Sequence, residues 1–133
     1  MRRRPAFLRD QSGASAAEFA IITPVFFALV FAVINFSIAL YAYVTLHFAT
    51  EDAARCYSLT TSCADANATQ TYAAGRYAGP NISPVFVASN TGQCHQNTGG
   101  AYDGHLVTGS GSMTLNLVLT SATISFSTQA CFP

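Results

Sequence analysis

The sequence predicts an α+β protein: a long N-terminal helix that crosses a membrane and continues as a stalk, then a short helix and a small antiparallel β domain stapled by disulfides. The first observation is a stretch without formal charge from Phe19 to Thr50, which exceeds the roughly 20 apolar residues that a spanning helix needs. The second is the alternation of apolar and polar residues from Met113 to Thr120, the period of a strand buried on one face. The third is the placement of all four cysteines after the apolar stretch.

These patterns divide the chain into a cytoplasmic basic leader (1–13), a long hydrophobic helix (14–58) and an extracytoplasmic α+β domain (59–133). At ~1.5 Å per residue the helix is on the order of 65 Å long, about twice the ~30 Å of a hydrocarbon core. We therefore expect residues 41–57 to extend beyond the membrane as a stalk. Pro24 lies inside the apolar stretch and, because it lacks a backbone N–H, is expected to kink or loosen the helix.

Basic residues are concentrated in the leader. It holds four arginines against one aspartate, a net charge of +3, and the rest of the chain holds two arginines against five acidic residues, a net charge of −3. Short basic segments stay on the cytoplasmic side of a membrane, so the C-terminal domain is expected outside, in an oxidising space where disulfides persist. No basic surface remains beyond the leader, which argues against nucleic-acid binding. The leader arginines are Arg2, Arg3, Arg4 and Arg9.

The outer domain begins with weaker signals. Residues 64–78 are rich in alanine and predict a short helix that ends at Gly79-Pro80. Residues 84–89 predict a strand, and residues 92–104, rich in Gly, Asn and Gln, predict a loop.

The C-terminal residues predict a β-hairpin. Ile124 and Phe126 continue the alternation that starts at Met113, after a turn near Ser121-Ala122. Before this hairpin, Gly109-Ser110-Gly111 is expected to be a loop, and it is no phosphate-binding loop because no lysine follows it.

One carboxylate stands at the start of the apolar segment, in the run Gly13-Ala14-Ser15-Ala16-Ala17-Glu18-Phe19. A charge in an apolar helix costs about 2.5–3.5 kcal/mol at the bilayer centre on insertion scales. An acid in this position therefore indicates a functional role. Further along, Asn35 and Ser37 are either donors to a neighbouring helix or simply tolerated polar residues.

The first 60 residues resemble a known family. Gly13 followed by Glu18-Phe19 and an apolar helix is similar to the processing site of type IV pilins and pseudopilins. With Pro24, Tyr41-Ala42-Tyr43 and the stretch from Ala49 to Arg55, the segment resembles the TadE-like minor pseudopilins of the tight-adherence (Tad, type IVc) pilus system. The chain departs from the family after Arg55, where Cys56-Tyr57-Ser58 stand in place of a glycine and a further alanine–arginine pair.

The resemblance implies that a prepilin peptidase cuts the chain between Gly13 and Ala14. Glu18, followed by Phe19, would then set the subunit register by pairing with the new amine of Ala14. The implied location is a bacterial inner membrane, with the N-terminus cytoplasmic and the C-terminal domain periplasmic, followed by incorporation into a surface pilus. There the subunit would act in assembly, priming or surface adhesion, and as a minor component, because major Tad subunits are much shorter. The implied partners are the membrane, the prepilin peptidase, the major pilin, other minor pseudopilins and an inner-membrane assembly platform.

Four cysteines allow three pairings. We favour the pairs 56–63 and 94–131, which would attach the long helix to the short one and close the strand region. By loop entropy, these two disulfides would stabilise the folded domain by roughly 2.5 and 4 kcal/mol, respectively. The alternative is a zinc site formed by Cys94, His95 and His105, although no paired C-x-x-C spacing supports it. The four cysteines are Cys56, Cys63, Cys94 and Cys131.

No catalytic constellation is recognisable in the sequence. The three histidines, His47, His95 and His105, follow no known catalytic order, and no G-x-S-x-G elbow is present. We therefore expect no enzyme activity, no cofactor, no metal and no small-molecule substrate. The alternative function is a signal-anchored single-pass membrane protein with an extracytoplasmic binding domain, which would keep residues 1–13 and have no fibre role.

Overall fold

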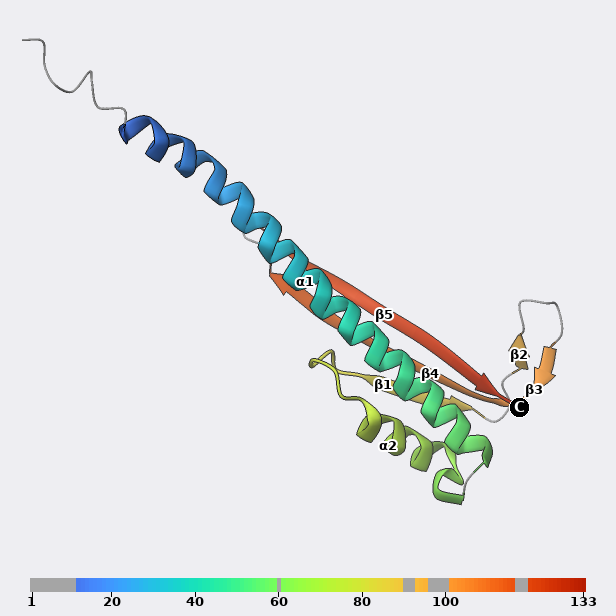
Figure 1. Ribbon diagram of the computed structural model, residues 1–133. Helices are drawn as coiled ribbons and strands as arrows, with labels where there is room; N and C mark the ends of the chain where they lie inside the picture. The colour runs from blue at the N-terminus through green and yellow to red at the C-terminus, as the bar shows by residue number, and fades with distance from the viewer. Residues whose placement is uncertain (1–11, 60, 90–92, 96–100, 117–119) are drawn as a thin grey trace, which may run out of the picture. The chain divides into compact units, whose positions relative to one another are not determined.

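The computed structural model describes residues 12–59, 61–89, 93–95, 101–116 and 120–133 (Figure 1). The predicted α+β class is confirmed by a long apolar helix, a short helix and, among the described residues, a three-stranded antiparallel sheet. Contacts divide the chain into two units, residues 1–35 and 36–133, which are described separately. Most of the predicted leader, residues 1–11, lies outside the described residues. The elements are α1 (Ser12–Leu59), the 3-10 helix η2 (Thr61–Cys63), α2 (Ala66–Arg76), β1 (Val85–Ser89), β2 (Gln93–His95), β3 (Ala101–Asp103), β4 (His105–Asn116) and β5 (Ser121–Phe132).

The first unit contains the N-terminal part of α1, a helix of 48 residues in all. Ala14, Ala16 and Ala17 are strong helix formers near its start. The helix continues through Pro24, whose missing N–H leaves the carbonyl of Ala20 without its usual donor. A kink at this position stays a prediction.

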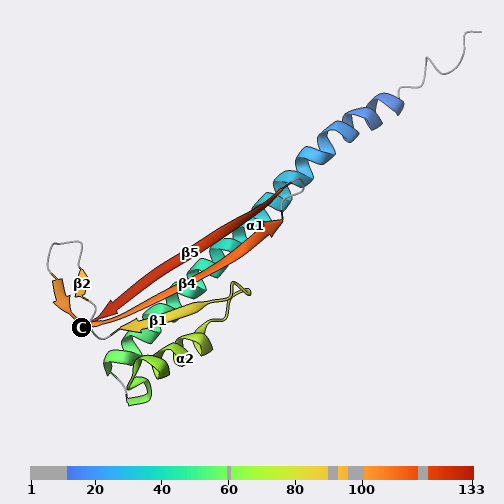
Figure 2. The ribbon, with the colours of Figure 1, turned by 180° about the vertical axis from the view of Figure 1, so that it is seen from behind.

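In the second unit, α1 buries one face against the sheet. Ala42, Leu46, Ala49 and Ala53 are buried and recur at the spacing of one helix face. Because three of these four residues are alanines, the helix backbone lies close to the strands, and Figure 2 shows β4 and β5 running along this part of α1. The segment predicted as a stalk therefore also supplies the core of the C-terminal domain.

The three-stranded sheet has the order β1–β4–β5, and both neighbouring pairs are antiparallel. Strands β4 and β5 pair continuously, from His105 opposite Phe132 to Asn116 opposite Ser121. Phe86 of β1 and Val107 of β4 are buried in the core with α1. Alternate positions of β4 and β5 are exposed residues with hydroxyl side chains, namely Ser110, Ser112, Thr114, Thr123, Ser125 and Ser127.

The predicted C-terminal hairpin is confirmed, but two details of the prediction are wrong. Ser121 and Ala122, the predicted turn, already belong to β5, and Gly109-Ser110-Gly111, the predicted loop, lies within β4. The physical reason is that Gly109 and Gly111 occupy the side of β4 that faces the core. In an ordinary strand that side would have apolar side chains. Because glycines stand there instead, the alternation of apolar and polar residues cannot be recognised in the sequence before Met113.

Gly109 allows the sheet to approach α1 closely. A Cβ atom at this position would meet the Thr50 hydroxyl, and it would lie 3.1 Å from Phe86 and 3.3 Å from Leu46.

Gly109→Ala is therefore expected to lower the free energy of unfolding by about 1–3 kcal/mol through overpacking, measured by denaturant titration of the full chain in detergent. Gly75→Ala is the control, because a Cβ there meets nothing within 4 Å and removing a helix glycine stabilises by about 0.5–1 kcal/mol. Equal stability of Gly109→Ala and the unchanged chain would contradict the close approach.

The predicted loop 92–104 is also wrong in part. It contains β2 and β3, which form a separate antiparallel pair with Cys94 opposite Tyr102. Strands of three residues are too short to show a period in the sequence, which explains why they were missed.

Helix α2 begins after Asp65, whose Oδ1 accepts a hydrogen bond from the backbone N–H of Ala68 at 2.7 Å. This cap satisfies one of the free donors of the first turn. The helix ends at Arg76, so it is shorter at each end than predicted. Beyond it, the hydroxyl of Tyr77 donates to the carbonyl of Pro80 at 2.6 Å, and burial raises the pKa of Tyr77.

Candidate functional site

The segment predicted to be processed forms the first turns of α1. Gly13 is exposed, and no atom lies within 4 Å of a Cβ built on it. Glu18 is exposed, and Phe19 is 73% exposed. Ala14 and Glu18 are four residues apart in one helix, so their positions share a face one turn apart. The structure thus places Gly13, Ala14, Glu18 and Phe19 in the first turns of one helix, with Gly13, Glu18 and Phe19 exposed.

Glu18 has no cationic partner in the described part of the first unit. Residues 12–35 contain no lysine, arginine or histidine. The ion pairs found among the described residues join side chains of the second unit. A group that could neutralise Glu18 inside an apolar environment must therefore come from elsewhere.

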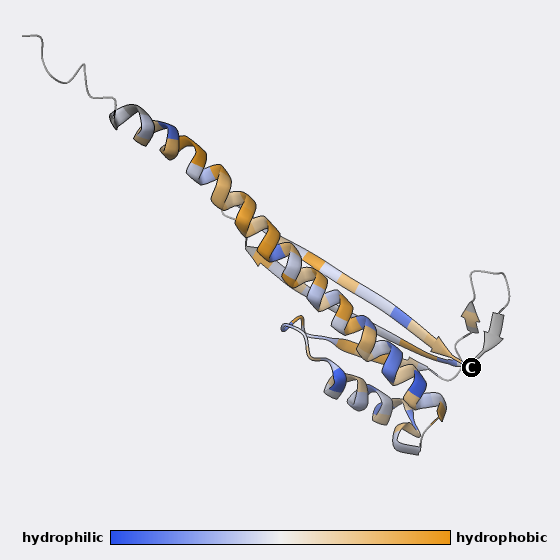
Figure 3. Ribbon diagram, in the orientation of Figure 1, coloured by the Kyte–Doolittle hydropathy of each residue, from blue (hydrophilic) through white to orange (hydrophobic). Residues whose placement is uncertain are grey.

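After its first turns, which are pale or blue, the N-terminal part of α1 is mostly orange in Figure 3, and its large apolar side chains are exposed. Among the described residues, α1 is the helix long and apolar enough to cross a membrane, and its most apolar window buries nothing within the chain. A helix that is apolar all round is normally buried in a large protein or in a membrane. At ~1.5 Å per residue, residues 12–35 extend about 36 Å, enough for a ~30 Å hydrocarbon core. The exposed large residues here are Phe19, Ile21, Ile22, Val25, Phe26, Phe27, Leu29, Phe31, Val33 and Ile34.

Two polar side chains of this unit bond to their own helix. The hydroxyl of Thr23 donates to the carbonyl of Phe19 at 2.6 Å, and the amide of Asn35 donates to the carbonyl of Phe31 at 2.8 Å. Such internal bonds lower the cost of a polar residue in lipid. The second N–H of the Asn35 amide could still donate to a neighbouring helix, so both alternatives for Asn35 stay predictions.

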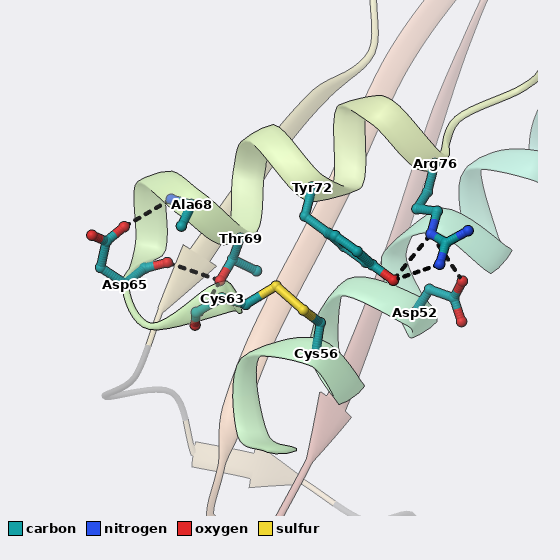
Figure 4. The surroundings of a disulfide bond; sticks show 8 residues. All are labelled: Asp52, Cys56, Cys63, Asp65, Ala68, Thr69, Tyr72 and Arg76. Carbon is teal, nitrogen blue, oxygen red and sulfur yellow. Dashed lines mark hydrogen bonds and ion pairs between the residues drawn. A yellow bond between two sulfur atoms is a disulfide. The ribbon is translucent and has the colours of Figure 1, made fainter. Parts of the chain in front are cut away.

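A disulfide joins the end of α1 to η2, three residues before α2 begins (Figure 4). The Cα atoms of Cys56 and Cys63 are 5.7 Å apart, and both residues are buried. Next to this bond, Arg76 donates from Nε and Nη2 to the Tyr72 hydroxyl at 3.0 and 2.9 Å, and its Nε lies 3.8 Å from Oδ2 of Asp52. The hydrogen bond to Tyr72 raises the pKa of Arg76, and the ion pair of Arg76 with Asp52 connects α2 to α1.

The second disulfide joins β2 to β5. The Cα atoms of Cys94 and Cys131 are 5.8 Å apart, so both bonds follow the pairing favoured from the sequence. Cys94 is thereby unavailable for the alternative zinc site, and the ring of His105 packs against Tyr57 with centroids 4.4 Å apart. Within the residues that the structure describes, no group of three or more His, Cys, Asp or Glu is placed to hold a metal.

Removing either disulfide is expected to destabilise the second unit. Replacing Cys56 and Cys63 by serine should cost about 2.5 kcal/mol, and replacing Cys94 and Cys131 should cost about 4 kcal/mol, because the second bond closes the longer loop. The free energies of unfolding of both double variants, measured side by side in urea, test this order. The unchanged chain under reducing conditions is the control and should be the least stable. A reversed order would contradict the loop-entropy explanation.

Sequence reasoning missed a groove between α1 and β5. It consists of two open hollows of about 320 and 470 Å³. Gln129 lines both hollows, which are therefore neighbours along the strand. No local signal could have indicated the groove, because its walls are more than 70 residues apart in the chain. The α1 wall contains Tyr43, His47, Glu51, Ala54 and Arg55, and the β5 wall contains residues 127–132.

Comparison with known proteins identifies the N-terminal segment. A family model described as "TadE-like protein" matches residues 13–55, the same stretch that carries the resemblance seen in the sequence, which is thereby confirmed. The family is pilus-associated, structural and non-enzymatic. No curated protein and no solved structure matches the chain.

Proposed function

We propose that this chain is a minor pilin-like subunit of a Tad (type IVc) pilus, cut after Gly13 and then incorporated into the fibre. The observation that carries the proposal is Glu18, an acid that has no basic partner within the described residues 12–35 and stands one turn after Ala14 on a helix with large exposed apolar side chains. The match of residues 13–55 to the TadE-like family supports the same assignment.

The freed N-terminus is the natural partner of Glu18. Residues 14–54 contain no lysine or arginine, so the α-amine created at Ala14 is the one strongly basic group that this stretch can acquire. The i,i+4 spacing allows the amine and the carboxylate to pair within one subunit, or each can pair with a neighbouring subunit. Both pairings remove the cost of an isolated charge in an apolar environment.

Before assembly, the first unit would lie in the bacterial inner membrane. The arginines of residues 1–11 would hold the leader on the cytoplasmic side, where a prepilin peptidase removes it. The second unit would fold in the periplasm, because its two disulfides need an oxidising space.

During assembly, the apolar surface of α1 would move from lipid to the helices of neighbouring subunits. The exposed Phe, Ile, Leu and Val side chains suit both environments, because neither offers polar partners. The partners in this step would be the major pilin, other minor pseudopilins and an inner-membrane assembly platform. The outer domain would then act in priming, assembly or surface adhesion.

Quantitative mass spectrometry of filaments sheared from the cell surface tests this function. The chain is expected in the sheared fraction at a small fraction of the amount of the major pilin. It should leave that fraction when the prepilin peptidase is inactivated. Recovery of the chain from membranes alone would contradict the proposal and favour a signal-anchored membrane protein.

A further inference from the structure

The two edges of the three-stranded sheet differ in how well they are protected from pairing with a further strand. Strand β1, at one edge, has five residues and packs beside α2. Strand β5, at the other edge, has 12 residues and pairs, among the described strands, with β4 alone. Among the described strands, none pairs with the other long side of β5.

Strand β5 lacks the features that normally prevent edge-to-edge pairing. Natural edge strands are short, bulged, charged or interrupted by proline. The segment Ser121–Phe132 contains no charged residue and no proline, and its pairing with β4 runs without a bulge. A regular edge of this length presents a row of backbone donors and acceptors that matches an extended chain.

The groove described above lies along this same edge. Its hollows of about 320 and 470 Å³ are lined by α1 on one side and by residues 127–132 of β5 on the other. A groove between an edge strand and a helix is the geometry in which extended peptides bind by strand addition. The backbone of β5 would supply the affinity, and the side chains of α1 would supply selectivity.

The α1 wall has polar groups of both signs. The Nδ1 atom of His47 lies 3.6 Å from Oε1 of Glu51, and the guanidinium of Arg55 lies 6.0 Å from the ring centroid of Phe132. This wall suits a segment with polar side chains, because an apolar strand would leave Glu51 and Arg55 desolvated without partners.

We propose that the α1–β5 groove binds an extended, polar segment of a different polypeptide as a fourth strand of the sheet. A second copy of this chain fits poorly. Its β5 strand, the edge strand that it could offer, contains no charged side chain, so Glu51 and Arg55 on the α1 wall would be desolvated without partners of opposite charge. The proposal goes beyond the pilin function and does not require cleavage after Gly13.

Site-specific photocrosslinking in the native bacterium tests the proposal with the full chain. A benzophenone side chain is placed at Thr123 or at Gln129, both exposed residues of β5. The two positions are about 20 Å apart along a strand. We expect both to crosslink to the same foreign polypeptide, at sites about six residues apart, as in an extended chain.

The control position is Ser112, an exposed residue of β4 that pairs with Ser125 of β5 on one side and donates its backbone N–H to the Ile82 carbonyl at 2.9 Å on the other. Formation of both disulfides in each variant shows that the domain has folded. Four results would overturn the proposal: crosslinks to a second copy of this chain, crosslinks to lipid, yields no higher than at Ser112, or sites about thirteen residues apart, the spacing of a helical partner. Loss of filament incorporation without loss of these crosslinks would count against the pilin function alone.

Discussion

Gly13→Leu is expected to leave residues 1–13 attached to the chain. The structure shows why this change isolates the cleavage step: a Cβ at Gly13 meets no atom within 4 Å, and leucine is a good helix former. The variant should therefore fold and insert normally. A bulky side chain at the scissile bond would nevertheless block the close approach of the peptidase to the backbone, and processing should be lost almost completely.

The matched control is Ala17→Leu, which places the same side chain one turn later on the exposed helix. This variant should be processed like the unchanged chain. Immunoblotting of the full-length and shortened forms measures both variants. Detection of the shortened chain in Gly13→Leu, with Ala14 at its N-terminus, would show that cleavage does not depend on the small residue.

Glu18→Gln is expected to be processed normally and to enter filaments poorly. The substitution keeps the size and exposure of the side chain but removes its charge, so the amine of Ala14 loses its partner in the apolar fibre. An unpaired charge in such an environment costs about 2.5–3.5 kcal/mol. Because each 1.4 kcal/mol is a factor of ten, incorporation should fall by about tenfold or more. The ratio of this chain to the major pilin in sheared filaments is the measurement.

Glu51→Gln provides the control for loss of a carboxylate. Glu51 lies on the same helix but in the second unit, where it faces His47 at 3.6 Å. Its removal should leave filament incorporation unchanged, although it changes one wall of the α1–β5 groove. An equal loss of incorporation in both variants would mean that the total charge of the chain matters and that pairing with the amine does not.

The long helix could be predicted from the sequence because its signal is compositional. Thirty-odd residues without charge from Phe19 to Thr50 allow few structures other than a helix in lipid. The disulfide pairing could also be predicted, since pairs formed by cysteines that are neighbours in the sequence fit the predicted order of elements. The packing of α1 against the sheet beyond Phe36 could not be predicted from the sequence, because the alanines that form its buried face look like ordinary helix formers.

The features that escaped prediction depend on contacts between distant residues. Gly109 reads as a loop residue in isolation, and it lies in a strand because Thr50 and Leu46 of α1 occupy the space of a side chain. The α1–β5 groove has no local signal for the same reason. In the N-terminal segment the opposite holds: the proposed site depends only on the spacing of Gly13, Ala14 and Glu18 along one helix, so the sequence alone is enough to propose it.

The most direct test of the account is the intact mass of the protein purified from native membranes without reduction. We predict a single polypeptide that starts at Ala14, contains residues 14–133 and has lost four hydrogen atoms to two disulfides. A chain that begins at Met1 and retains the arginines of the leader would contradict the central claim, because Glu18 would then have no freed amine to meet.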